Sequence, residues 1–200
     1  KSEGSNSVWL YSDCKSDAGV KDCGLLTRSF LQDGMIDLGL GAYPVFSDIN
    51  SDGLTDLVVG NYGLYDTCVL NDQGQLKCYY TARLYLYLNN GTPANPSFTL
   101  VDDDFGNVSQ LGLQGVYPAF ADLDGDNDYD MLLGNSEGGL WKFTNLAGQG
   151  TIPVFENPLT EFQNLAVEDF STPVFVDISG DGLDDLVVGG ISGKLSYFEN

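Results

Sequence analysis

The chain has 200 residues, of which 42% are hydrophobic and 12% aromatic, enough for a packed core. Its 29 acidic and 8 basic residues give a formal net charge of −21, which repels nucleic acid and anionic membranes, so we expect neither partner. No apolar run approaches the ~18 residues of a membrane span, so no membrane insertion is expected. Histidine is absent, which removes the commonest general base and transition-metal ligand. The carboxylate excess instead indicates bound cations.

Two segments near the N-terminus, residues 8–13 and 25–31, have the composition of half-buried strands. Between them, Cys14 and Cys23 bracket a polar loop, as Cys68 and Cys78 do farther along. We expect local disulfides, although four cysteines allow several connectivities and the sequence alone does not choose between them. Neither pair has the C-x-x-C spacing of a zinc or redox site. Disulfides predict an oxidising compartment, hence a secreted, extracellular or cell-surface protein.

An internal repeat is the strongest feature of the sequence. Each copy begins with a predicted strand, an acidic loop and a second strand, in residues 43–60, 117–134 and 172–189. A third strand, alternating and rich in aromatics, follows in residues 84–89, 140–145 and 195–200. Fourth strands are expected at residues 97–101 and 152–156. The N-terminal segments match the third and fourth strands at a similar spacing.

The repeat predicts an all-β fold of four-stranded antiparallel propeller-type blades, about three in number, incomplete or completed by another chain or subunit. The predicted parts are a half blade 8–42, a blade 43–116 with a disulfide-pinned insertion 61–83, a blade 117–171, and a blade 172–200 that lacks its last strand. Propellers normally close with about four to eight blades, so this chain is too short to close alone. A fragment of a longer propeller and a self-assembling protomer are both open interpretations.

Each acidic loop offers side-chain oxygens at its first, third, fifth and ninth positions and a backbone carbonyl at its seventh. The predicted ligands of the first loop are Asp48, Asn50, Asp52, Leu54 and Asp56. Those of the second loop are Asp122, Asp124, Asp126, Asp128 and Asp130. Those of the third loop are Asp177, Ser179, Asp181, Leu183 and Asp185. A hard cation prefers six to eight oxygens at about 2.3–2.6 Å, so we predict three Ca²⁺ sites.

The sixth position is Gly53, Asn127 or Gly182, residue types that tolerate the left-handed backbone of a sharp turn. An EF-hand is excluded because the twelfth position is apolar in all three loops rather than Glu. Mg²⁺ is disfavoured since it prefers few carboxylates and several waters. A solvated Asx-rich turn explains one such loop but not three in register. We expect calcium affinity to rank second loop over first over third, because the second has most aspartates and the third substitutes serine.

These residues resemble the FG-GAP/VCBS repeats of integrin-α-type β-propellers. The pattern is Pro-x-Phe-x-Asp-x-Asx-x-Asp-Gly-x-x-Asp-Leu-x-Val-Gly, then Gly-x-Leu-x-x-Phe-x-Asn, as at Pro173–Gly189 and Gly193–Asn200. The likeness covers about residues 8–200. It implies that each loop joins the first two strands of a blade and that Ca²⁺ rigidifies it. Departures from the pattern are Asn127 for Gly, Ser179 for Asx, the cysteine-bearing insertion and too few repeats for the family's usual ring.

Three classes of function follow. Catalysis is not expected, because histidine and a Gly-x-Ser-x-Gly elbow are absent and calcium needs most of the acidic residues. An extracellular structural or adhesive role ranks first, with a strand from Val8 of one copy completing a blade of its neighbour. Recognition of an extracellular glycan or protein ranks second, because the insertion carries several tyrosines that could stack on sugars. Those tyrosines, which otherwise cover the blade edge, are Tyr62, Tyr65, Tyr79 and Tyr80.

Overall fold

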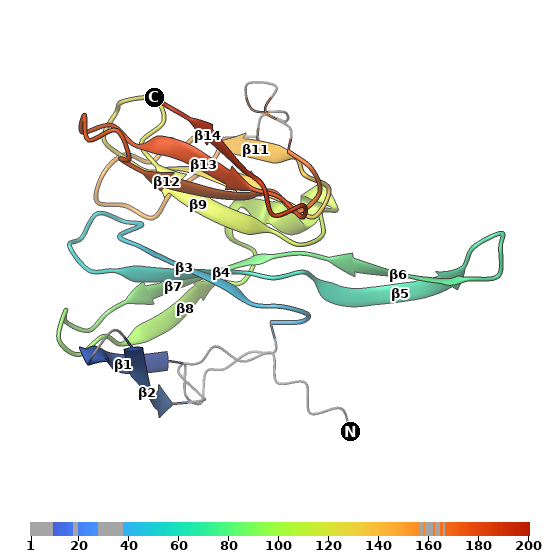
Figure 1. The fold of residues 1–200 in the computed structure, drawn as a ribbon, viewed down its shortest axis with the longest axis horizontal. Helices are drawn as coiled ribbons and strands as arrows, with labels where there is room; N and C mark the ends of the chain where they lie inside the picture. Colours follow the sequence, from blue (N-terminus) through green and yellow to red (C-terminus); the bar gives the residue numbers. More distant parts are fainter. Residues whose placement is uncertain are drawn as a thin grey trace.

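The computed structural model describes residues 10–17, 20–27, 38–156, 158, 162, 165 and 167–200, and for residues 10–27 the backbone alone. This part of the chain is all-β, built from small antiparallel sheets and one short 3₁₀ helix, η2 (Phe105–Leu111) (Figure 1). The described sheets form no closed barrel. The predicted fold class of incomplete propeller-type blades is thereby confirmed. No helix among the described residues has the length and apolar character needed to cross a membrane.

The first blade is a four-stranded sheet in which each strand pairs with its neighbour in the order β3-β4-β7-β8. Its strands are β3 (Tyr43–Ser47), β4 (Asp56–Gly60), β7 (Leu84–Asn89) and β8 (Phe98–Asp102). The β-branched and aromatic residues of β4 and β7 suit two central strands that are covered on both faces. The fourth strand lies within one residue of the segment 97–101 expected from the sequence.

The insertion of the first blade forms a separate two-stranded hairpin of β5 (Leu64–Leu70) and β6 (Leu76–Thr81), which projects far from the sheets in Figure 1. A disulfide joins Cys68 and Cys78, which face each other across the two strands. The local pairing expected for these cysteines is therefore confirmed. The insertion leaves the blade intact, because β7 still pairs directly with β4.

The second and third blades each have three named strands. The second contains β9 (Tyr117–Ala121), β10 (Asp130–Gly134) and β11 (Leu140–Phe143), in the order β11-β10-β9. The third contains β12 (Thr172–Val176), β13 (Asp185–Gly189) and β14 (Leu195–Phe198), in that order. The expected fourth strand at 152–156 is reduced to a single bridge between Asn145 and Phe155, because Pro153 has no N–H to donate to a ladder.

The N-terminal strands β1 (Leu10–Asp17) and β2 (Val20–Thr27) pair with each other as a two-stranded sheet. They extend through the region expected to be a polar loop, and β2 begins before the segment 25–31 expected as a strand. Residues 8–9 and 28–31 of the predicted strands lie outside the described residues. The side chains of Cys14 and Cys23 do so as well, so their pairing stays a prediction.

The central strand of the second blade, β10, packs against a neighbouring blade on each face. In the first blade, Val58 packs in one cluster with Met131 and Leu133 of the second blade. Leu132, the residue between them, packs instead with Leu186 and Val188 of the third blade. Because successive side chains of a strand point to opposite faces, one short apolar run serves two neighbours. The blades therefore stack face to face, as Figure 1 shows.

Neighbouring blades approach closely where the second strand ends at a glycine. A Cβ on Gly60 would lie 2.2 Å from the carbonyl oxygen of Val116, and one on Gly134 would lie 2.0 Å from that of Ser171. Both oxygens come just before the first strand of the next blade. These contacts hold the same ends of neighbouring blades together, so the acidic loops gather at the other end.

Candidate calcium sites

The first residue of each acidic loop organises the backbone that follows. Its carboxylate accepts an N–H from the sixth residue: Gly53 to Asp48 at 2.9 Å, Asn127 to Asp122 at 3.0 Å, and Gly182 to Asp177 at 3.0 Å. The second carboxylate oxygen accepts an N–H from the fourth or fifth residue in each loop. The three loops therefore fold around their first aspartate in the same way.

Left-handed backbone occurs where the sequence predicted it. The sixth residues have φ of 87° at Gly53, 68° at Asn127 and 91° at Gly182. This confirms the expectation that Asn127 takes the place of glycine, since Asn tolerates this conformation better than most residues. The fourth residues Ser51, Gly125 and Gly180 also have positive φ, which the sequence analysis missed. Two reversals so close together turn the loop back on itself.

The ninth residue is buried in all three loops: Asp56 and Asp185 are 0% exposed and Asp130 is 1% exposed. Each carboxylate accepts a backbone N–H from the asparagine that follows the third strand or ends it. These bonds run from Asn89 to Asp56 at 2.8 Å, from Asn145 to Asp130 at 2.8 Å, and from Asn200 to Asp185 at 3.0 Å. The sequence predicted no role for these asparagines, although one recurs at the end of each repeat.

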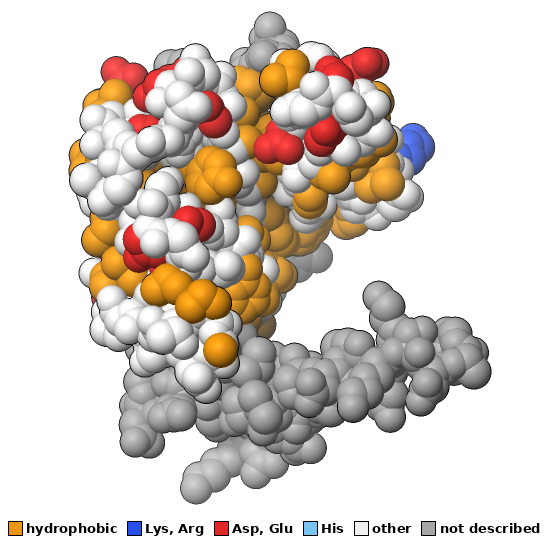
Figure 2. All heavy atoms as spheres, turned by 90° about the vertical axis from the view of Figure 1, so that its left-hand side faces the viewer, with side chains coloured by type: hydrophobic (Ala, Val, Ile, Leu, Met, Phe, Trp, Pro, Cys, Tyr) orange, Lys and Arg blue, Asp and Glu red, His pale blue; other side chains and the backbone are white. Residues whose placement is uncertain are grey.

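The carboxylates of the second loop approach one another most closely. Asp122, Asp124 and Asp126 each present an oxygen within 4.8 Å of the others, and all three side chains are exposed. Among the described residues, no other set of three acidic, cysteine or histidine ligands comes together in this way. Figure 2 shows acidic side chains gathered in separate groups on one face of the molecule. The ninth residue, Asp130, is not part of the close group.

The electrostatics of the second loop favour a cation. Desolvation, together with the charges of Asp130 and Asp126, raises the pKa of Asp124 above its ordinary value. Burial and then the charge of Asp126 raise the pKa of Asp128. Raised carboxyl pKa values mean that the ionised forms are disfavoured as the side chains stand. A bound cation would remove that penalty.

Two side chains of the second loop differ from the sequence expectation. Asp128 was expected to offer its carbonyl, yet its side chain is buried, with Oδ2 accepting the Gly148 N–H at 3.0 Å and Oδ1 without a hydrogen-bond partner. Lys142 Nζ lies 3.2 Å from Oδ2 of Asp130 and forms an ion pair with it. The sequence pattern did not predict this pair. The ammonium offsets part of the loop's negative charge. This acts against the higher calcium affinity expected of five aspartates.

The first and third loops differ from each other in how the surrounding protein affects the carboxylate of the ninth residue. Burial raises the pKa of Asp56, with the Asn89 and Ile49 N–H groups acting in the opposite direction. The pKa of Asp185 is lowered, first by the Asn200 N–H, because this carboxylate also accepts from Ser179, Ile178 and the Tyr197 hydroxyl. Asp185 is thus stabilised as an anion by the protein itself.

The donor set of the second loop fits Ca²⁺. It offers converging exposed carboxylates, a buried carboxylate oxygen without a partner in Asp128, and oxygen ligands alone, which a hard cation prefers. The residues that would hold the ion are those predicted from the sequence, with Asp122, Asp124 and Asp126 nearest to one another. The first and third loops share the backbone arrangement but lack a close group of three carboxylates among the described residues.

Three tyrosines of the insertion form one aromatic cluster, because the Tyr80 ring meets Tyr62 at 5.7 Å and Tyr65 at 6.1 Å, both edge to face. Tyr62 and Tyr80 are half-buried, while Tyr65 and Tyr79 are exposed. The tip of the hairpin exposes Leu70 and Leu76 as well. Tyr65 and Tyr79 therefore present exposed ring surface, although Tyr65 also packs against the cluster at the base of the hairpin.

Comparison with known proteins gives no family assignment: no family model matches the chain, and no curated protein matches it.

Proposed function

We propose that this protein is a non-enzymatic, extracellular calcium-binding β-repeat protein with a structural or adhesive role. The observation that carries the proposal is the convergence of Asp122, Asp124 and Asp126 within 4.8 Å in a loop whose backbone arrangement recurs twice. Close carboxylates repel unless a cation neutralises them. The resemblance to FG-GAP/VCBS repeats supports the same assignment. The disulfide between Cys68 and Cys78 supports an oxidising location.

In this proposal Ca²⁺ acts on folding rather than on chemistry. It would fix the loops that join the first two strands of each blade, and so the ends of the blades themselves. An ion that binds only the native state stabilises it by mass action. The free energy of unfolding would therefore be higher in calcium-rich extracellular fluid. The adhesive role includes association with other copies by strand addition at unpaired sheet edges.

The test is an isothermal calcium titration of chelator-treated protein, combined with size-exclusion chromatography and light scattering in calcium and in EDTA. We expect calcium binding at the three loops and calcium-dependent species larger than a monomer. An unchanged mass in both conditions would contradict self-assembly while leaving calcium binding intact. Absence of any bound calcium would contradict the metal assignment itself.

Recognition of a glycan or protein by the hairpin β5–β6 is the second candidate. It rests on the exposed rings of Tyr65 and Tyr79, held on a disulfide-linked ladder where ordering costs little entropy on binding. A glycan array probed with the wild type and with a Tyr65→Ala, Tyr79→Ala double variant tests it. Signals that the double variant retains in full would argue against this surface.

A further inference from the structure

Two tyrosines meet where the first strands of neighbouring blades begin. Tyr43 is the first residue of β3 and Tyr117 the first residue of β9, and the two positions match in the repeat. Their ring centroids lie 4.6 Å apart, with an angle of 47° between the ring planes. Among the ring pairs of the described residues, this is the shortest separation. Rings this close have carbon atoms in van der Waals contact.

The hydroxyl ends of these two side chains lie together. Burial, and then a hydrogen bond with the Tyr43 side chain, raise the pKa of Tyr117 above its ordinary value. Because a hydrogen bond makes the two phenol oxygens neighbours, the ring carbons next to each oxygen lie near the partner ring. Both tyrosines are half-buried, so part of each side chain stays accessible to solvent.

Two glycines bring the backbone close to the phenol oxygens. A Cβ on Gly41 would lie 2.8 Å from the hydroxyl oxygen of Tyr43, and one on Gly115 would lie 3.2 Å from that of Tyr117. Both glycines have positive φ, 75° at Gly41 and 60° at Gly115, which glycine adopts without strain. Backbone packed this closely restricts the movement of both rings and keeps the pair together.

Further tyrosines connect this pair to the surface. Tyr62 lies beside Tyr117, because a Cβ on Gly115 would lie 3.2 Å both from Tyr62 Cδ2 and from the Tyr117 hydroxyl. The Tyr80 ring in turn meets Tyr62 at 5.7 Å and Tyr65 at 6.1 Å. Tyr65 is 62% exposed. A chain of neighbouring phenols allows an electron vacancy that forms at the surface to pass inward in short steps.

We propose that Tyr43 and Tyr117 are a site of oxidative cross-linking, at which a carbon–carbon bond between the two rings joins the first blade to the second. The oxidant is hydrogen peroxide acting through a haem peroxidase, which removes electrons one at a time. Each tyrosine gives up one electron and one proton, and together these reduce one hydrogen peroxide to two waters. The two phenoxyl radicals couple through ring carbons next to their oxygens. Each bonded carbon then releases its proton while its oxygen gains one, so both rings become aromatic phenols again.

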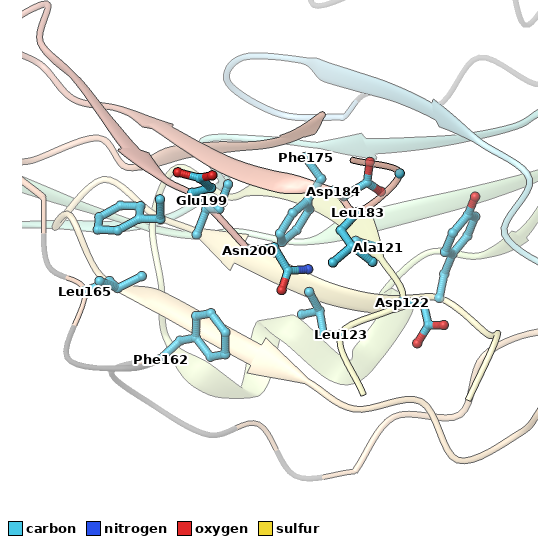
Figure 3. Close-up of a pocket in the computed structure, with 14 residues that line it drawn as sticks. Ala121, Asp122, Leu123, Phe162, Leu165, Phe175, Leu183, Asp184, Glu199 and Asn200 are labelled. Atoms are coloured by element: carbon cyan, nitrogen blue, oxygen red, sulfur yellow. The ribbon is translucent and has the colours of Figure 1, made fainter. Parts of the chain in front are cut away.

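The second and third blades meet differently. The residue of β12 that matches the two tyrosines is Thr172, which forms no phenoxyl radical. Beside β12 lies a pocket of about 470 Å³, whose walls include Ala121 of the second blade and Phe175 of the third (Figure 3). Tyr129 is the one tyrosine among its lining residues. An oxidised Tyr129 therefore has no second phenol in this pocket, and we expect the cross-link between the first two blades alone.

The cross-link is independent of calcium binding. Tyr43 pairs with Gly60 and Tyr117 with Gly134, so both tyrosines lie at the end of the blades opposite the acidic loops. Peroxide chemistry suits the oxidising location that the Cys68–Cys78 disulfide supports. The bond adds a covalent link between blades that otherwise hold together by packing.

The experiment treats the whole chain, at low concentration, with a haem peroxidase and hydrogen peroxide, and then records dityrosine fluorescence and the intact mass. We expect a monomer that has lost two hydrogen atoms. Tandem mass spectrometry of its proteolytic peptides should place the new bond between Tyr43 and Tyr117. Because the link closes a loop of roughly 75 residues, it should raise the melting temperature by roughly 10 °C.

Three variants locate the site. Tyr43→Phe and Tyr117→Phe should each abolish the link, because phenylalanine keeps the ring but forms no phenoxyl radical. Tyr79→Phe is the matched control, since Tyr79 is 38% exposed and lies on the hairpin, and it should form the link as the wild type does. Circular dichroism melts before oxidation check that all variants fold, and oxidation in denaturing urea should lower the yield. No intramolecular link in the folded wild type, or an equal yield in urea or in either of the first two variants, would overturn the proposal.

Discussion

Gly134 lies where two blades touch, and its lack of a side chain is a packing requirement. A Cβ there would stand 2.0 Å from the Ser171 carbonyl oxygen, a backbone atom that cannot rotate away. We expect Gly134→Ala to destabilise the protein by about 1–3 kcal/mol, the usual cost of overpacking. The measurement is urea unfolding followed by circular dichroism.

Gly189 provides the control for that variant. It holds the same place in the third blade, but its Cβ would meet the hydroxyl of Thr172 at 2.6 Å, and that side chain can turn aside. Gly189→Ala should therefore cost clearly less than Gly134→Ala. Equal losses at the two sites would show that the glycines matter for strand geometry rather than for contact between blades.

Tyr87 is buried, and its hydroxyl has no hydrogen-bond partner within the described part of the chain. Since an unsatisfied buried hydroxyl is costly, Tyr87→Phe should stabilise the protein by about 1 kcal/mol at neutral pH. Burial also raises the Tyr87 pKa from 10.0 to about 12. A raised folded pKa means that stability is retained below pH 10 and falls as pH rises from 10 through 12.

The loss of stability that follows from the raised Tyr87 pKa is measured by thermal unfolding at increasing pH. Melting temperatures taken at several pH values from neutral to 12 should fall less steeply for Tyr87→Phe than for the wild type. Tyr65→Phe is the matched control, because Tyr65 is 62% exposed, and it should follow the wild-type curve. A Tyr87→Phe curve that coincides with the wild type would contradict the assignment of this residue to the alkaline loss.

At the scale of elements, the acidic loops differ in how their carboxylates are arranged. Asp126 belongs to the close group of the second loop, and its Oδ1 also accepts the Asp128 N–H at 3.0 Å. Asp126→Ala should remove calcium from the second site alone, because the other loops share no ligand with it. Calcium counted by mass spectrometry of the native protein should fall by one ion per chain.

Asp184→Ala is the control for this measurement, because Asp184 is an exposed aspartate that is not among the predicted ligands. It should leave the calcium count unchanged. A stepwise titration of the wild type should fill the second loop first, then the first, then the third. Calcium counts that do not respond to Asp126→Ala would sink the assignment of the second site.

The hairpin β5–β6 depends on its disulfide more than the blades do. The Cys68–Cys78 link closes a short loop, and such links contribute about 2–3 kcal/mol by restricting the unfolded segment. Replacing both cysteines by serine should open the hairpin to protease, since an isolated two-stranded hairpin is only marginally stable. The melting temperature of the blades should change little, because β4 and β7 pair without the hairpin.

Limited trypsin digestion separates these effects, because Lys77 lies within β6. The serine variant should be cut there faster than the oxidised wild type, while the remaining blades keep their melting temperature. A global loss of stability on reduction would instead mean that the hairpin supports the first blade.

Repeat comparison alone was sufficient to predict the all-β fold and the strands that carry the acidic loops, because alternation and loop spacing are local properties. The sixth-position turns at Gly53 and Asn127 were predictable for the same reason. The ion pair of Lys142 with Asp130, the buried side chain of Asp128 and the packing of the Ser171 carbonyl against Gly134 were not. Each depends on distant segments that meet only after the sheets have formed and stacked.

At the scale of the whole molecule, the blades form a row in which sheet contacts link the first to the second and the second to the third. Stability in such a row is the sum of the blades and the interfaces between neighbours. The acidic loops lie at the same end of the blades. Without bound calcium, their negative charges would therefore repel one another across the interfaces between blades. The net charge of −21 makes this a large effect for a chain of this size.

Chelation should therefore lower the melting temperature of the whole row. Each site held at a hundredfold excess of calcium over its Kd contributes about 2.7 kcal/mol, or roughly 5–10 °C in a chain of this length. About 1 M NaCl, where the Debye length is about 3 Å, should recover part of the loss by screening repulsion. Mg²⁺ should recover less than calcium, because crowded carboxylates suit it poorly. Scanning calorimetry measures all four conditions, and equal curves in calcium and EDTA would mean that the loops hold no ion that matters for folding.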